Sequence, residues 1–397
     1  MPFFAKIGNR SFPTSYVTVG AILFISIGLW TIPLLAGWTS FGLEDYVEYW
    51  AAGRLIARGE NPYDPAAIHR EELEASPDLT EAIMMWNPPW ALTVAVPFGW
   101  LPPHMGHGIW LFLQSLLVFF CGDWVWQHYG GPPSHRWLAC AVTLGFAPTF
   151  LAVRMGQITP LVLLGIVGFL HFQKRGQGFW AGAAASLAAI KPHLAVFFAL
   201  ALWLWLLQYR RWSIAFGGFV TLLVMTAIPL AYNPAVIGQY LFAVSQYPPR
   251  FLCPTPGSLL RLVFGEDKLW LNLIPAIFGL VWFGFHWRSR RHSWDWKDQV
   301  SILFFASLLT ATYGVWPFDL VVLLLPVLHA AVTVFLSRNI HAARFGLTAL
   351  FGFNVLAVLF MNVKYRDQYW NVWMTPMLLY CYWRLRGHGD GQLQSAE

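Results

Sequence analysis

The sequence predicts an all-α polytopic membrane protein with about twelve transmembrane helices. Of its 397 residues, 57% are hydrophobic and only 11% are charged, whereas soluble proteins carry about 25% charged residues. The apolar residues form long runs separated by short polar segments. Most Lys and Arg residues gather in alternate polar segments, as the positive-inside rule requires of inner loops. The net charge of +6 therefore reflects membrane topology, and no nucleic-acid partner is expected.

The first apolar run, Val17–Trp38, is predicted to be a retained span with the N-terminus inside. Lys6 and Arg10 precede this run. It is too long for a signal peptide and lacks a small-x-small cleavage site. The span therefore delivers the chain to the outer side of the membrane.

Residues 39–103 are predicted to form the first outer loop, which is amphipathic and helical. Ten of the 19 acidic residues of the chain lie between Glu44 and Glu81. A helix is expected to run to Arg58, because Gly59 supplies the left-handed residue that ends many helices. A second acidic helix is expected within residues 65–81.

A short apolar run at residues 88–101 determines the predicted topology. It has about 14 residues, fewer than the ~20 that cross a bilayer, so we expect a membrane-embedded hairpin of the outer loop. If this run spanned, Lys174-Arg175 and Arg210-Arg211 would move to the outer side, against the positive-inside rule. Eleven further spans are predicted at residues 104–129, 137–153, 158–172, 179–190, 193–207, 212–231, 269–287, 300–313, 318–336, 345–361 and 370–383. Both chain ends then lie inside, and residues 1–397 are expected to form one domain with a second large outer loop at 232–268.

Two outer breaks between short spans carry polar residues. One is Arg154-Met155-Gly156-Gln157, and the other is Lys191-Pro192-His193. A Lys at membrane depth costs on the order of 2.5–3.5 kcal/mol and is a functional candidate, and broken helices at that depth line cavities. Arg154, Lys191 and His193 are therefore predicted to hold an anion such as a phosphate. In the alternative, Arg154 and Lys191 only snorkel to the outer headgroups.

The acidic segment after the first span supplies the candidate catalytic group. Asp45, Glu48 and Tyr49 are spaced to share one helix face. A carboxylate at the mouth of a membrane bundle is a candidate general base, so we assign that role to Asp45 and keep Glu44 as the fallback. The alternative is an interfacial helix in which Tyr49 and Trp50 are belt residues.

Three other outer residues complete the candidate site. The loop at 232–268 offers the cations Arg250 and Arg261, and Asp319 stands at the head of a predicted span. Asp319 has an alternative role as a favourable partner of the helix dipole. No metal or cofactor is expected, because the four cysteines lack CxxC spacing and no P-loop or dinucleotide fingerprint occurs.

Several of these motifs together resemble glycosyltransferase family 87. They are Asp45-Tyr46-x-x-Tyr49, Gly59-x-Asn61-Pro62-Tyr63-Asp64, Pro88-Pro89, Gly156-Gln157, Lys191-Pro192 and Trp316-Pro317-Phe318-Asp319. The resemblance implies a GT-C-like bundle that transfers a sugar, typically mannose, from a polyprenyl phosphate on the outer side of the membrane. It also implies an inverting reaction with Asp45 as base, and Gln157 and Lys191 at the donor site. Several relatives have a His-containing motif where this chain has Phe318-Asp319, so the role of Asp319 stays open.

The function expected from the sequence is therefore that of a membrane glycosyltransferase. Its partners would be a polyprenyl-phosphate sugar, a lipid or glycan acceptor, and membrane lipids. Glu48, Tyr49 and Gln157 are expected to contact substrate. The bacterial plasma membrane, with the site facing the periplasm or exterior, is the expected location. The alternatives are a transporter or flippase of a lipid-linked sugar and a catalytically inactive scaffold.

Overall fold

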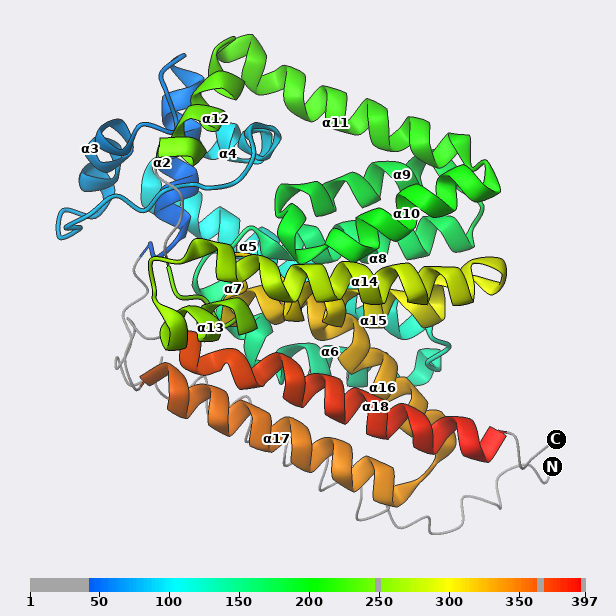
Figure 1. The fold of residues 1–397 in the computed structure, drawn as a ribbon. Coiled ribbons are helices and arrows are strands. Elements are labelled where there is room, and N and C mark those ends of the chain that lie inside the picture. The colour runs from blue at the N-terminus through cyan, green and yellow to red at the C-terminus, as the bar shows by residue number, and fades with distance from the viewer. Residues whose placement is uncertain (1–42, 247–250, 363–367, 394–397) are drawn as a thin grey trace, which may run out of the picture.

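The computed structural model describes residues 43–246, 251–362 and 368–393, and the regular elements in these ranges are all helices (Figure 1). The predicted first span, Val17–Trp38, lies outside the described residues, as does Arg250. The all-α prediction is confirmed for the described part of the chain.

The described part of the predicted first outer loop contains helices, but the first of them is not amphipathic. Helix α2 (Tyr46–Ala57) has ten buried residues out of twelve, and Tyr49 and Trp50 are fully buried. The interfacial alternative is therefore wrong, because α2 packs inside the protein against α4 (Leu92–Gly99). A side chain at Gly53 would collide with the backbone of Ala95, so glycine permits this close approach.

The first of the two predicted helices ends where expected, whereas the second ends at Ala75, before the predicted residue 81. Gly59 has φ +75° directly after the last turn of α2. Helix α3 (Pro65–Ala75) follows, and Asp64 caps it by accepting a hydrogen bond from the backbone N–H of Ala66. The short apolar run at residues 88–101 forms a 3-10 turn and α4, which together cover Pro89–Gly99. This segment is too short to span a bilayer.

Five helices in the described residues are long and apolar enough to cross a membrane, or six if one bent pair counts as a single span. The five are Pro103–His128 (α5), Trp212–Tyr232 (α11), Leu269–Ser293 (containing α14, Leu273–Arg290), Pro317–Ser337 (η7 and α16) and Ile340–Phe360 (within α17, Ile340–Asn362). The bent pair joins Pro133–Leu144 to Ala147–Arg154 at 64°. The chain is thus an integral membrane protein, but the predicted count of twelve spans is not confirmed.

The remaining helices are shorter or less apolar. They are α6 (Arg136–Leu144), α7 (Ala147–Arg154), α8 (Thr159–Lys174), α9 (Gly178–Ala185), η3 (Ser186–Ile190), η4 (Pro192–Leu194), α10 (Val196–Tyr209), α12 (Val236–Gln246), α13 (Pro256–Phe264), α15 (Trp296–Leu309), η8 (Gln368–Trp373) and α18 (Met374–Leu393). Each predicted span from His104 onward overlaps one or more of the helices named here.

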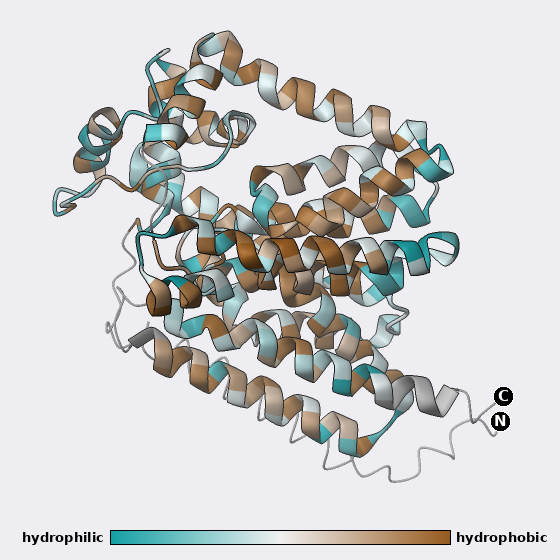
Figure 2. Cartoon of the chain, viewed as in Figure 1, coloured by the Kyte–Doolittle hydropathy of each residue, from teal (hydrophilic) through white to brown (hydrophobic). Residues whose placement is uncertain are grey.

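The long helices run side by side, and α2, α3 and α4 gather at one end of them (Figure 1). Hydrophilic residues concentrate at the two ends of the bundle (Figure 2). In the most apolar window of Pro317–Ser337, 61% of the residues are buried, whereas the corresponding share for Leu269–Ser293 is 17%, and α14 exposes Phe278 and Phe285. The central position of η7 and α16 places Asp319 in the interior of the protein.

Candidate active site

The N-terminus of α2 brings Asp45 to the break between α7 and α8. There the side-chain amide of Gln157 donates a hydrogen bond to Asp45, with Nε2 and Oδ2 2.5 Å apart. Gly156 has φ +64°, and a side chain on it would meet Tyr46, so glycine is required before Gln157. The break and the helix terminus thus place the two side chains against each other.

The orientation of Gln157 is fixed by two donors. Its Oε1 accepts hydrogen bonds from the Tyr49 hydroxyl at 3.1 Å and from Lys191 Nζ at 2.7 Å. A carboxamide oxygen only accepts and its nitrogen only donates. Because the oxygen faces Tyr49 and Lys191, the amide N–H group faces Asp45.

Lys191 lies in the chain break between η3 and η4, as the sequence predicts, but it does not snorkel. Its Nζ is 2.8 Å from Asp319 Oδ1 and lies 5.3 Å from the centroid of the Phe318 ring. The Lys191 side chain is 10% exposed and that of Asp319 is fully buried. The two charges form a buried ion pair, which is stable only when both partners are present and well hydrogen-bonded.

Asp319 accepts hydrogen bonds from three groups. Besides Lys191, Thr159 Oγ1 donates to Oδ1 at 2.5 Å, and the backbone N–H of Trp316 donates to Oδ2 at 3.0 Å. The Trp316 contact is the helix-start role that the sequence left open for Asp319. Asp319 performs it and also neutralises Lys191.

The carboxyl groups of the cluster differ from ordinary surface acids. Burial raises the pKa of Asp45 to about 6, although the hydrogen bond from Gln157 and the charge of Lys191 oppose the rise. Burial, then the neighbouring charge of Asp45, raises the pKa of Glu48 well above its usual range. With a pKa of about 6, Asp45 is largely ionised near pH 7.

Arg154 pairs with Glu44, the residue before Asp45, and one of its buried N–H groups lacks a partner. Its Nη2 is 3.6 Å from Glu44 Oε1, and its side chain is 20% exposed. Its buried Nε has no hydrogen-bond partner. A buried guanidinium donor without a partner is costly, and an anionic ligand would satisfy it.

His193 and Arg261 are turned toward loop backbone. His193 Nε2 lies 2.9 Å from the carbonyl oxygen of Gly314, and burial lowers the pKa of His193 to about 4. A neutral imidazole does not supply the positive charge expected of this residue. Arg261 of α13 is 2% exposed and donates to the carbonyl oxygens of Glu266 and Phe251.

The structure therefore brings five predicted residues into one hydrogen-bonded cluster. They are Asp45, Tyr49, Gln157, Lys191 and Asp319. Glu48 is buried on the same helix. Arg154 reaches the edge of the cluster through Glu44, which Asp45 follows in the sequence.

Sequence reasoning missed two residues of this region. Thr159 donates a hydrogen bond to Asp319. In the sequence it is marked only as a hydroxyl residue at the start of an apolar run. Trp110 of α5 stacks on Tyr49 with ring centroids 5.6 Å apart and donates to the carbonyl oxygen of Gly156 at 2.8 Å. Nothing in its apolar surroundings distinguishes Trp110 from a core residue.

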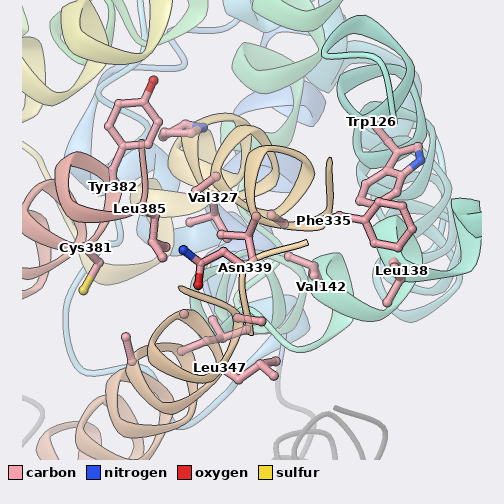
Figure 3. A pocket seen from close by; sticks show the side chains of 18 of the residues that line it. Trp126, Leu138, Val142, Val327, Phe335, Asn339, Leu347, Cys381, Tyr382 and Leu385 are labelled. Carbon is pink, nitrogen blue, oxygen red and sulfur yellow. The ribbon is translucent and has the colours of Figure 1, made fainter. Parts of the chain in front are cut away.

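A separate cavity of about 760 Å³ opens among α5, α6, α16, α17 and α18 (Figure 3). It is lined mainly by apolar side chains such as Trp126, Phe335, Leu347 and Leu385. No residue of the Asp45 cluster contributes to its wall.

Comparison with known proteins identifies one family. The sequence profile of glycosyltransferase family 87 matches residues 86–363, which is more than half of the chain. The match includes Gln157, Lys191 and Asp319 and begins after Asp45. No curated protein and no solved structure matches the chain.

Proposed function

The chain belongs to glycosyltransferase family 87, and we propose that it transfers a sugar from a polyprenyl-phosphate donor to a lipid or glycan acceptor. Mannose is the first sugar to test, and the outer face of the membrane is the proposed side of reaction. The observation that carries the proposal is the contact between Asp45 and an oriented Gln157 within a buried cluster of charged groups.

Asp45 is proposed as the general base. An acceptor hydroxyl attacks the anomeric carbon of the sugar, its proton passes to Asp45, and the carbon–oxygen bond to the phosphate breaks. The product has inverted configuration, the polyprenyl phosphate leaves, and Asp45 returns its proton to water. A base with a pKa of about 6 is mostly ionised at pH 7 and still has useful proton affinity.

Arg154 is the first choice for the residue that binds the donor phosphate. Its Nε is buried without a partner, and its side chain remains partly exposed. Lys191 is a weaker choice because Gln157 and Asp319 already accept from its Nζ. Arg250 and Arg261 remain further candidates on the basis of the sequence.

The proposed outward orientation follows from the charge distribution. The candidate site lies at the end of the bundle that carries α2 and the acidic helix α3 (Figure 1). A basic cluster, Arg288, Arg290 and Arg291, lies at the C-terminal end of α14, which is at the other end of the bundle (Figure 1). The positive-inside rule then assigns the site to the outer face, and the bacterial plasma membrane is the proposed location.

The decisive experiment compares three purified proteins reconstituted in sealed lipid vesicles with polyprenyl-phosphate mannose, radiolabelled in the sugar, and a lipid extract. They are the wild type, Asp45→Asn and Glu74→Gln. Asp45→Asn removes the base and should lower transfer by about 10²-fold or more. Glu74→Gln makes the same carboxylate-to-amide change on an exposed residue of α3 that pairs with Arg54, so transfer should be unchanged.

Undiminished transfer by well-folded Asp45→Asn protein would remove the base assignment. Label that crosses the membrane without entering a new product would favour the transporter alternative. An inactive wild type that purifies with a second transferase would favour the scaffold.

A further inference from the structure

A continuous chain of hydrogen bonds connects Asp319 to Asp45. It runs from Asp319 to Lys191 at 2.8 Å, from Lys191 to Gln157 at 2.7 Å, and from Gln157 to Asp45 at 2.5 Å. The first and last members are 274 positions apart in the sequence but lie at two ends of one buried cluster.

The chain has a fixed direction because each link uses a group with only one role. An ammonium only donates, so Lys191 requires acceptors at both Asp319 and Gln157. The carboxamide oxygen of Gln157 then faces Lys191, and its N–H group is left for Asp45. If Lys191 were withdrawn, the amide could rotate and present its oxygen to Asp45, which would repel the carboxylate.

Asp319 holds Lys191 in this position. It is itself fixed by the Thr159 hydroxyl and the backbone N–H of Trp316. The flat face of Phe318 covers Lys191 from another side. Asp319 therefore holds in place, and supplies the counter-charge to, the group that orients Gln157.

We infer that Asp319 is a positioning residue, which acts through Lys191 and Gln157 to set the hydrogen bonding and ionisation of Asp45. The inference rests on the proposed function in that Asp45 is taken as the base. It assigns Asp319 a role in tuning the reaction instead of contact with substrate.

Asp45 lies among several other charged or titratable groups, which must be considered in any pH argument. On its own helix these are Glu44, Glu48 and Tyr49. The elements packed around this helix contribute Lys191, Asp319, the neutral His193, and Arg154, which pairs with Glu44. Among the charged groups, Glu44 and Asp319 raise the pKa of Asp45 and Lys191 lowers it.

The expected direction of change follows from these signs. Asp319→Asn removes one negative charge, so the positive charge of Lys191 is no longer compensated and the pKa of Asp45 should fall. The acidic limb of the transfer profile should then move to lower pH, by roughly one pH unit. The double variant Asp319→Asn with Lys191→Met removes both charges, so the limb should return toward that of the wild type.

The experiment measures Asp45 itself as well as transfer. The rate at which a hydrophobic carbodiimide modifies Asp45 is followed by mass spectrometry from pH 4 to 9, because carbodiimide attacks the protonated carboxyl group. Transfer is measured over the same range. The matched control is Asp298→Asn, which breaks an ion pair with Arg386 at 2.8 Å, outside the Asp45 cluster.

The inference predicts a lower pH midpoint of Asp45 labelling in Asp319→Asn. It also predicts a midpoint close to that of the wild type in the double variant and an unchanged midpoint in Asp298→Asn. An unchanged midpoint in Asp319→Asn would overturn it. A double variant displaced as far as Asp319→Asn would also overturn it, because that result indicates general disturbance and not charge. If Asp45 labelling shifts as expected but the wild type transfers no sugar, the positioning role stands and the proposed function fails.

Discussion

Two regions of the molecule differ in what they offer a substrate. The Asp45 cluster is small and polar, and its buried charges are joined by short hydrogen bonds. The apolar cavity among α5, α6, α16, α17 and α18 encloses about 760 Å³. Sugar transfer requires a base and groups that stabilise developing charge. The Asp45 cluster offers such groups, whereas the wall of the cavity is mainly apolar.

Three of the polar side chains that line the cavity are engaged in local structure. Ser134 and His135 contact each other at 2.9 Å. Asn339 caps the start of α17 by accepting hydrogen bonds from the backbone N–H groups of His341 and Ala342. In the Asp45 cluster the partners come from distant helices, at an energetic cost that a purely structural core avoids. Convergent polar groups therefore distinguish a candidate site better than volume does.

The largest effect in this comparison is expected from Lys191→Met. The change leaves the fully buried Asp319 without its counter-charge, which should reduce the free energy of unfolding by about 3–5 kcal/mol. Thermal unfolding in detergent measures the effect. Lys174→Met is the control, because Lys174 is an exposed residue whose Nζ contacts only a backbone carbonyl at 3.4 Å. Equal stability of the two variants would show that the Lys191–Asp319 pair is not essential to the fold.

A smaller effect is expected from Gln157→Leu. The variant removes the donor to Asp45, so transfer should fall by roughly 10- to 100-fold. Because the Gln157 hydrogen bond lowers the pKa of Asp45, its loss should raise that pKa and move the acidic limb of the pH profile upward. The profile of kcat against pH measures both effects.

The control for this prediction is Gln177→Leu, in an exposed turn where the side chain makes no capping hydrogen bond. It should leave the profile unchanged. An acidic limb that moves downward in Gln157→Leu would contradict the assigned direction of the hydrogen bond.

The smallest effect is expected from Ala343→Leu, which fills part of the apolar cavity. The added methylenes gain apolar contacts in space that is already present, so the melting temperature should stay the same or rise slightly. Transfer should remain unchanged, because Ala343 lines the apolar cavity and no residue of the Asp45 cluster contributes to that wall. A large loss of transfer in a stable Ala343→Leu protein would show that the cavity takes part in the reaction.

Much of the fold could be predicted because helices depend on local pattern. The apolar runs from His104 onward overlap helices. Gly59 adopts a positive φ directly after α2, as its position at the end of the predicted helix suggests. Gln157 and Lys191 are identifiable as candidate functional residues because placing polar groups at membrane depth has a high free-energy cost. The family resemblance was also present in the sequence and is confirmed over residues 86–363.

The sequence by itself thus determined the helical class, the polar breaks and the residues worth testing. Only the tertiary structure decided that α2 is buried, that Asp319 neutralises Lys191, and that Arg261 holds a loop. The physical reason is that a side chain's partner is chosen by packing between helices far apart in the sequence. Lys191 and Asp319 are separated by 128 positions. A local sequence pattern cannot predict which buried carboxylate will pair with a buried lysine.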